Sequence, residues 1–165
     1  MILQLFTKPK ELDLERTYRA PLTTVWDAWT RPEVLRQWWG PEKTLVPECR
    51  IDLRVGGEIY IVMEAGAEMG RYQGTRWPMA GTLTRVEAPS RLSYEARSWT
   101  EGEEATSTIV HTNDITLTED QGMTTVRLHV SITQIGSKAK MAAFGMKWGY
   151  KQQLAKLGKH LEAHT

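Results

Sequence analysis

Residues 137–163 read SKAKMAAFGMKWGYKQQLAKLGKHLEA, and the spacing of their apolar side chains predicts one long helix. At 3.6 residues per turn, one face of this helix collects ten residues that should dock onto a sheet. They are Ala139, Ala142, Ala143, Met146, Gly149, Tyr150, Gln153, Leu154, Leu157 and Leu161. The first half of this face carries glycine and alanines, whereas the second half carries three leucines. We therefore expect a gap between the first half and the sheet, which would be a ligand cavity unless bulky sheet residues fill it.

The rest of the chain predicts strands, because apolar and polar residues alternate with a period of two. The predicted strands cover residues 12–19, 48–53, 58–65, 75–87, 91–99, 107–118 and 124–133. Two short helices, opened by Pro21 and Pro32, follow the first strand. Pro78 and Gly81 suggest an edge position or a bulge for strand 75–87. Residues 66–74 are predicted to be a mobile connection, and residues 101–104 a solvated acidic loop.

Successive antiparallel strands with one long helix indicate an α+β fold, in which a curved antiparallel sheet of about seven strands wraps around the C-terminal helix. The length of 165 residues indicates one domain, with a core at about 12–163 and an N-terminal extension at 1–11.

Charge and composition exclude several classes of function. The chain has 21 Lys and Arg against 20 Asp and Glu, so no overall field attracts nucleic acid or an anionic membrane. The sequence shows neither a signal-peptide pattern nor an apolar run long enough to span a bilayer. With Cys49 alone there is no internal disulfide, and we therefore expect a cytoplasmic protein.

Several short motifs follow one another in a characteristic order from about Leu12 to the end of the chain. They are Ala20-Pro21 with Val25-Trp26 and Ala28-Trp29-Thr30, Pro32-Glu33, Trp38-Trp39-Gly40-Pro41, Asp52-Leu53-Arg54-Val55-Gly56-Gly57, and Gly149-Tyr150 with Leu154, Leu157, His160 and Leu161. In this order and spacing the chain resembles the activator of Hsp90 ATPase (AHSA1)-like family of the START-like, or SRPBCC, superfamily.

This resemblance implies a helix-grip fold with a hydrophobic pocket between the sheet and the long helix. It does not imply one reaction, because relatives include lipid carriers, hormone receptors and cyclases, so the function has to be argued from the site. Tyr150 is a departure, since the family more often has Trp after the glycine. The change signals either a wetter cavity or a tolerated aromatic swap.

His111 and Asn113 are the most informative polar residues. They alternate with Ile109 and Ile115, so both side chains face the helix unless a bulge turns them to solvent. An unsatisfied polar group in a sealed core costs about 1–3 kcal/mol, which makes a cavity with water or ligand an attractive environment for them. His111 is also the best catalytic candidate, because a partly buried imidazole can titrate near neutral pH. Conventional catalytic motifs are missing from the sequence, and whether the protein is an enzyme stays open.

Further candidate ligand contacts come from the inward faces of the predicted elements. Arg16 should face inward on the first strand, either paired with Glu58 or Glu95 or free to meet a ligand carboxylate. Tryptophans near the short helices either line the pocket mouth or belong to the core. The candidates, besides Arg16, His111 and Asn113, are Trp29, Trp38, Ile61, Met63, Trp77, Tyr94, Met146 and Tyr150. His160 and His164 lie one helical turn apart without a third ligand, so we predict no metal site and no cofactor.

A second apolar stripe lies almost opposite the docking face of the long helix. We call Met141, Phe144 and Trp148 the outer stripe. It either packs beneath loops or forms a homodimer contact with the same stripe of a second subunit.

Three functions remain open from the sequence. The first is binding of a small hydrophobic ligand, with Arg16, His111 and Asn113 as polar anchors. The second is a cyclase-type or hydrolase-type enzyme that uses the same cavity. The third is a protein-interaction, co-chaperone-like module that acts through the tryptophan-rich helices or the outer stripe.

Overall fold

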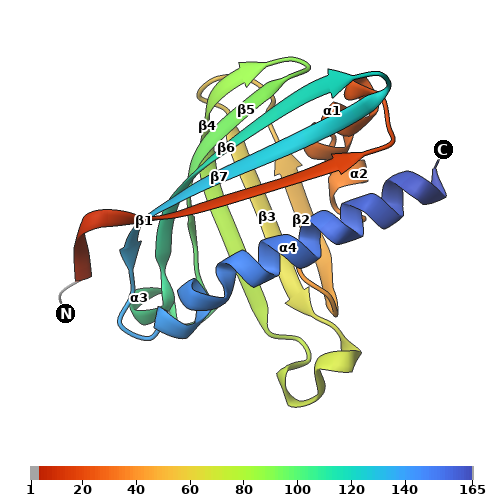
Figure 1. The fold of residues 1–165 in the computed structure, drawn as a ribbon. Helices are drawn as coiled ribbons and strands as arrows, with labels where there is room; N and C mark the ends of the chain where they lie inside the picture. The colour runs from red at the N-terminus through yellow and green to blue at the C-terminus, as the bar shows by residue number, and fades with distance from the viewer. Residues whose placement is uncertain (1–3, 165) are drawn as a thin grey trace.

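The computed structural model describes residues 4–164 and contains one antiparallel sheet of seven strands crossed by a long helix (Figure 1). The strands are β1 Gln4–Tyr18, β2 Thr44–Ile51, β3 Glu58–Ala65, β4 Arg76–Glu87, β5 Arg91–Ser98, β6 Ile109–Asp120 and β7 Met123–Ile135. The helices are α1 Leu22–Thr30, α2 Pro32–Leu35, the 3-10 helix η1 Ala67–Tyr72, α3 Glu104–Ser107 and α4 Lys140–Ala163. The strand order is β1-β7-β6-β5-β4-β3-β2, which confirms the predicted α+β helix-grip fold.

The sheet is built mostly from hairpins, since each strand from β2 to β7 pairs with its neighbour in sequence. The turn between β6 and β7 uses positive φ angles at Gln121 and Gly122, as expected for a tight hairpin. β1 then pairs antiparallel with β7 along the edge of the sheet. The two short helices connect β1 to β2, which lie at opposite edges of the sheet.

Several element boundaries differ from the sequence predictions. β1 begins at Gln4, and a register shift between Leu5 and Lys10 lets this earlier stretch pair with β7. β2 begins at Thr44, with a similar shift before Glu48. The 3-10 helix η1 lies within the predicted connection 66–74. The helix α3 begins at the last residue of the predicted acidic loop 101–104 and ends at Ser107, so β6 begins at Ile109 and not at residue 107. The first three residues of the predicted N-terminal extension lie outside the described residues.

β4 is an interior strand between β3 and β5, so the predicted edge position is wrong. The alternative, a bulge, is present as a register shift between Leu83 and Arg85. Gly81 has a different explanation, because a Cβ there would lie 2.5 Å from the Glu95 carbonyl oxygen and 2.9 Å from the Ala96 Cβ. The close approach of β5, not an exposed edge, explains the glycine.

The two halves of α4 are packed differently. Leu154, Leu157 and Leu161 in the second half are buried, and the Tyr18 hydroxyl on β1 donates to the Leu154 carbonyl at 2.8 Å. In the first half, Tyr150 is only half-buried. Figure 1 shows α1 and α2 near one end of the sheet, and η1 and α3 near the other, by the start of α4. The second half of α4 is therefore packed more tightly than its first half, which lies at the end of the sheet near η1 and α3.

A tryptophan cluster fills the core beside α1 and α2. Trp29 meets Trp38 and Trp39 edge-on, with ring centroids 4.9 Å and 6.1 Å apart, and all three rings are buried. The Trp38 indole donates to the Ala28 carbonyl at 3.0 Å. Edge-to-face contacts of this kind stabilise aromatic cores beyond their area burial. Within residues 4–164 no helix is long and apolar enough to cross a membrane.

Candidate ligand cavity

A cavity of about 420 Å³ lies between the first half of α4 and the sheet. Its walls come from the Trp39–Thr44 loop, β3, η1, β4, the end of β5, the α3 region and α4. The lining residues are Trp39, Pro41, Glu42, Thr44, Ile61, Met63, Met69, Trp77, Met79, Ser98, Trp99, Thr100, Ser107, Ile109, Ala142, Gly145, Met146, Gly149, Tyr150 and Gln153. This volume is within the range of small-molecule pockets.

The cavity exists because α4 presents small side chains over it. A Cβ built on Gly145 or Gly149 would meet nothing within 4 Å, so no sheet residue reaches up to fill the space. Ala142 adds only a methyl group on the same side. This is the gap that the change from small residues to leucines along the helix predicts.

A chain of hydrogen bonds lies behind the wall of the cavity, on β5, β6 and α4. Asn113 donates through Nδ2 to the Tyr150 hydroxyl at 3.1 Å, which leaves Asn113 Oδ1 to accept from His111 Nδ1 at 2.5 Å. The other imidazole nitrogen, Nε2, lies 3.0 Å from Ser98 Oγ. In a neutral imidazole Nε2 is then the acceptor, so Ser98 donates to it. His111 and Asn113 are both 1% exposed, so the inward alternative is correct and no bulge turns them to solvent.

Burial governs the protonation of this network. It lowers the pKa of His111 below the ordinary histidine value, and the hydrogen bond with Asn113 opposes this shift only in part. The imidazole is therefore neutral at neutral pH. Burial likewise raises the pKa of Tyr150 to about 12 and raises the pKa of Tyr94. Both phenols therefore keep their protons at neutral pH, and the Tyr94 hydroxyl is buried without a hydrogen-bond partner among the described residues.

Gln153 is the polar residue that the sequence did not single out as a site residue. Its side chain is 4% exposed, and its Oε1 accepts the Gly40 backbone N–H at 3.1 Å. Its Nε2, although buried, has no hydrogen-bond partner among the described residues. Gln153 lines the cavity, but Nε2 itself has almost no accessible surface, so this donor is buried at the cavity wall. The one signal in the sequence is a glutamine within an otherwise apolar helix face.

The candidate residues fall into three groups. Ile61, Met63, Trp77, Met146 and Tyr150 line the cavity. His111 and Asn113 lie one layer behind it and reach it through Ser98 and Tyr150. The third group, Trp29, Trp38 and Tyr94, is buried in the core without lining the cavity, and Trp39 takes the lining position near the short helices.

Arg16 lies on the predicted face of β1, but its side chain is not buried there. It shares the face of β1 that carries Leu14 and Tyr18, but its side chain is exposed and its guanidinium lies 5.8 Å from the centre of the Tyr18 ring. The expected partner Glu58 binds Arg50 instead, at 3.0 Å. Because β1 is an edge strand, a long side chain can pass the small Gly158 of α4 and reach water.

Other reactive side chains are poorly placed for chemistry. Cys49 is half-buried, and burial raises its pKa to about 11, so its thiol stays protonated and is a weak nucleophile. His160 and His164 stack with ring centroids 4.2 Å apart. No group of three or more potential metal ligands occurs within residues 4–164.

Comparisons with known proteins identify a family and several solved structures that are similar to this chain. The sequence model of the family described as activator of Hsp90 ATPase homolog 1-like protein matches residues 19–162. No curated protein matches the chain. Among solved structures, an uncharacterized protein from Rhizobium leguminosarum is similar with a TM-score of 0.78, 20% identity and coverage of 99% of each chain.

Two further structures have the same fold. A protein from Nitrosomonas europaea is 25% identical, with a TM-score of 0.72 over 93% of this chain and 95% of that one. A protein called AHSA1 from Silicibacter pomeroyi is 22% identical, with a TM-score of 0.69 over 94% of this chain and 100% of that one.

Proposed function

This chain belongs to the activator of Hsp90 ATPase homolog 1-like family, and we propose that it binds a small, mainly apolar molecule in the cavity between the sheet and α4. The observation that carries the proposal is the cavity itself, kept open by Gly145 and Gly149 where a packed helix would carry larger side chains. Its lining is mostly aliphatic, aromatic and methionine side chains, with a few polar groups. This composition is typical of sites that bind small molecules.

The energetics suit a ligand of modest size. Burying about 300 Å² of apolar ligand surface contributes roughly 7 kcal/mol before the costs of association are subtracted. Useful affinity therefore needs a shaped cavity and a few polar anchors. Gln153 and Tyr150 line the cavity and are the polar candidates for these anchors, whereas Asn113 acts indirectly through the Tyr150 hydroxyl to which it donates. Arg16 is exposed, so we do not propose it as an anchor.

The first test is native mass spectrometry of protein purified without detergent, followed by organic extraction of any retained molecule. We expect a mass excess that the extract accounts for as a small, mainly apolar compound. Gly149→Leu places a large side chain in the cavity and should abolish retention. Lys147→Leu adds a leucine at an exposed position of the same helix that does not line the cavity, and should leave retention unchanged. Equal retention by both variants would refute binding in this cavity.

A second candidate function is catalysis, which one contact favours. Ser98 lines the cavity and its Oγ lies 3.0 Å from Nε2 of a neutral, buried His111, so a proton can pass between the cavity wall and the imidazole. The two candidates differ in the behaviour of His111→Gln. An enzyme would keep binding and lose conversion of the retained compound, followed by mass spectrometry over time. If the native protein does not convert the retained compound, catalysis is refuted and binding remains as the proposed function.

A further inference from the structure

Methionine is concentrated in the wall of the cavity. Met63, Met69, Met79 and Met146 line it, whereas Met79 is the one methionine among the buried apolar side chains of the described core. That core is otherwise made of Leu, Ile, Val, Ala, Trp and Tyr, yet within residues 10–164 no leucine or valine lines the cavity. The cavity is therefore not simply an unfilled part of the core, because its wall has a different composition.

The strand register places these side chains beside one another on the sheet side of the cavity, which we call its floor. Met63 on β3 pairs directly with Trp77 on β4. In the next row, Ile61 pairs with Met79, and Met79 pairs in turn with Ser98 on β5. All five residues line the cavity, and directly opposite residues on one face of an antiparallel pair have Cβ atoms about 4.5–5.5 Å apart. A thioether and an indole therefore lie next to each other in the floor.

Aromatic rings form much of the remaining wall. Besides Trp77, the lining includes Trp39 from the loop before β2, Trp99 from the end of β5 and Tyr150 from α4. An aromatic ring has a negative face and a positive edge, so a second ring can meet either part of it, edge-to-face or offset. A saturated ring of the same size has no such charge distribution, and it gains only from the apolar surface that it removes from water.

The methionine sulfur atoms add a second preference for rings. A thioether sulfur about 5 Å from an aromatic ring makes a favourable contact that a saturated ring does not offer. Methionine also has three rotatable bonds, so its side chain can adjust to the position of a ring. On the opposite side of the cavity α4 leaves space, since a Cβ on Gly145 or Gly149 would meet nothing within 4 Å. A ring in the cavity therefore has both room and matching contacts.

We propose, resting on the proposed function, that the cavity selects a molecule with an aromatic ring over a saturated molecule of the same carbon skeleton. The ring lies over the Met63–Trp77 pair, between the floor and the first half of α4. The preference comes from the sulfur atoms and rings of the wall. It should therefore weaken when methionine is replaced by leucine, which keeps the volume of the side chain but removes the sulfur.

Two probes that differ only in the ring test this selection, 4-phenylbutan-1-ol and 4-cyclohexylbutan-1-ol. The protein carries carbon-13 in its methionine methyl groups, and binding is followed through the methyl resonances of the four lining methionines. Because the saturated ring is the more hydrophobic, each association constant is divided by the measured partition coefficient of the compound between hexadecane and water. We expect this corrected affinity to be about tenfold higher for the phenyl compound, the effect of one or two sulfur–ring and ring–ring contacts. The resonances of Met123 and Met141, which do not line the cavity, should not shift.

Met63→Leu combined with Met146→Leu removes two sulfur atoms from the wall. This double variant should reduce the corrected advantage of the phenyl compound from about tenfold to about threefold, while the affinity for the cyclohexyl compound stays the same. The matched control is Met141→Leu, which makes the same change at an exposed position of α4 that does not line the cavity. It should leave both affinities unchanged. The preference measured on the unchanged protein needs no variant to fold.

The possible outcomes separate this selection from the binding function. Equal corrected affinities, or a higher one for the cyclohexyl compound, would overturn the selection of an aromatic ring while leaving the binding function intact. An advantage that the double variant keeps in full would overturn it as well, because the sulfur atoms would then not be its source. If neither probe shifts a lining methyl resonance, or if Gly149→Leu weakens the binding of neither, the binding function fails and the selection fails with it.

Discussion

Gly145 and Gly149 keep the first half of α4 thin, and replacing both with alanine should stabilise the protein. Glycine within a helix is less favourable than alanine by about 0.5–1 kcal/mol, because it loses more backbone entropy on folding. A Cβ at either position would meet nothing within 4 Å, so no steric term opposes this gain. The double variant should therefore gain about 1–2 kcal/mol in free energy of unfolding. For a chain of this size, that corresponds to a rise in Tm of about 2–8 °C.

The assay is urea unfolding followed by tryptophan fluorescence, in which the midpoint should rise while the m-value stays unchanged. Gly81→Ala is the contrasting variant, because its Cβ would lie 2.5 Å from a backbone oxygen, and it should lower the midpoint. A double variant that is no more stable than the native protein would refute the open space beside the helix. If the gain appears, the native glycines sacrifice stability for volume, as a site that must hold a ligand requires.

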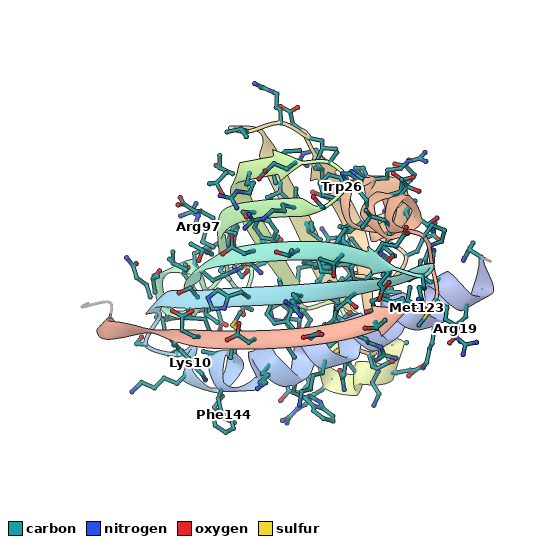
Figure 2. All side chains as sticks on the ribbon, turned by 45° about the horizontal axis from the view of Figure 1, so that its top comes forward. Lys10, Arg19, Trp26, Arg97, Met123 and Phe144 are labelled. Atoms are coloured by element: carbon teal, nitrogen blue, oxygen red, sulfur yellow. The ribbon has the colours of Figure 1, made fainter. Side chains whose placement is uncertain are left out.

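The remaining predictions concern association and pH. The outer stripe is exposed, at 83% for Phe144 and 66% for Trp148, and Figure 2 shows Phe144 projecting away from the body. We predict a homodimer through this stripe. Its affinity should rise with salt, because salt screens the repulsion between the flanking lysines of the two copies. Sedimentation that shows monomer at every concentration and ionic strength would refute the dimer. Burial lowers the pKa of His111, so on acidification the unfolded chain takes up the histidine proton before the folded protein does. The stability that neutral His111 contributes should therefore be present above about pH 6.5 and lost as the pH falls. The hydrogen bond that His129 Nδ1 donates to the Asp13 carboxylate raises the pKa of His129. The stability that this pair contributes should therefore be complete below about pH 6.5 and lost as the pH rises. Urea unfolding from pH 5 to 8 should show His111→Gln and His129→Gln changing the slope of stability against pH with opposite signs, and slopes that change alike would contradict the two environments.

Local patterns in the sequence were sufficient for the seven strands and for α1, α2 and α4, but not for η1 and α3. The period-two alternation on β6 placed His111 and Asn113 inward because the strand has no bulge between them. The change from glycine and alanine to leucine on α4 predicted where the helix would leave space. Both predictions depend only on the geometry of one element and on burial, which side-chain spacing encodes directly.

The sequence predictions that failed concerned residues whose environment depends on neighbours that are distant in sequence. Pro78 and Gly81 suggested an edge strand, whereas Gly81 reflects the approach of β5 at Ala96. Arg16 lies on the predicted face, yet at the edge of the sheet, beside Gly158, that face is open to water. Gln153 was placed on the docking face, but its free donor depends on where the loop at Gly40 meets the helix. None of these contacts leaves a trace in the local sequence.

The departure at Tyr150 shows how a single contact decides between two interpretations of a sequence. A tolerated aromatic swap requires that tyrosine and tryptophan make equivalent contacts. In the structure the Tyr150 hydroxyl accepts from the buried Asn113 Nδ2 at 3.1 Å, and an indole N–H is a donor that accepts nothing. Tryptophan would leave the amide of Asn113 unpaired, at a cost of about 1–3 kcal/mol. The tyrosine therefore completes the polar network behind the cavity, so the change is not an equivalent aromatic swap.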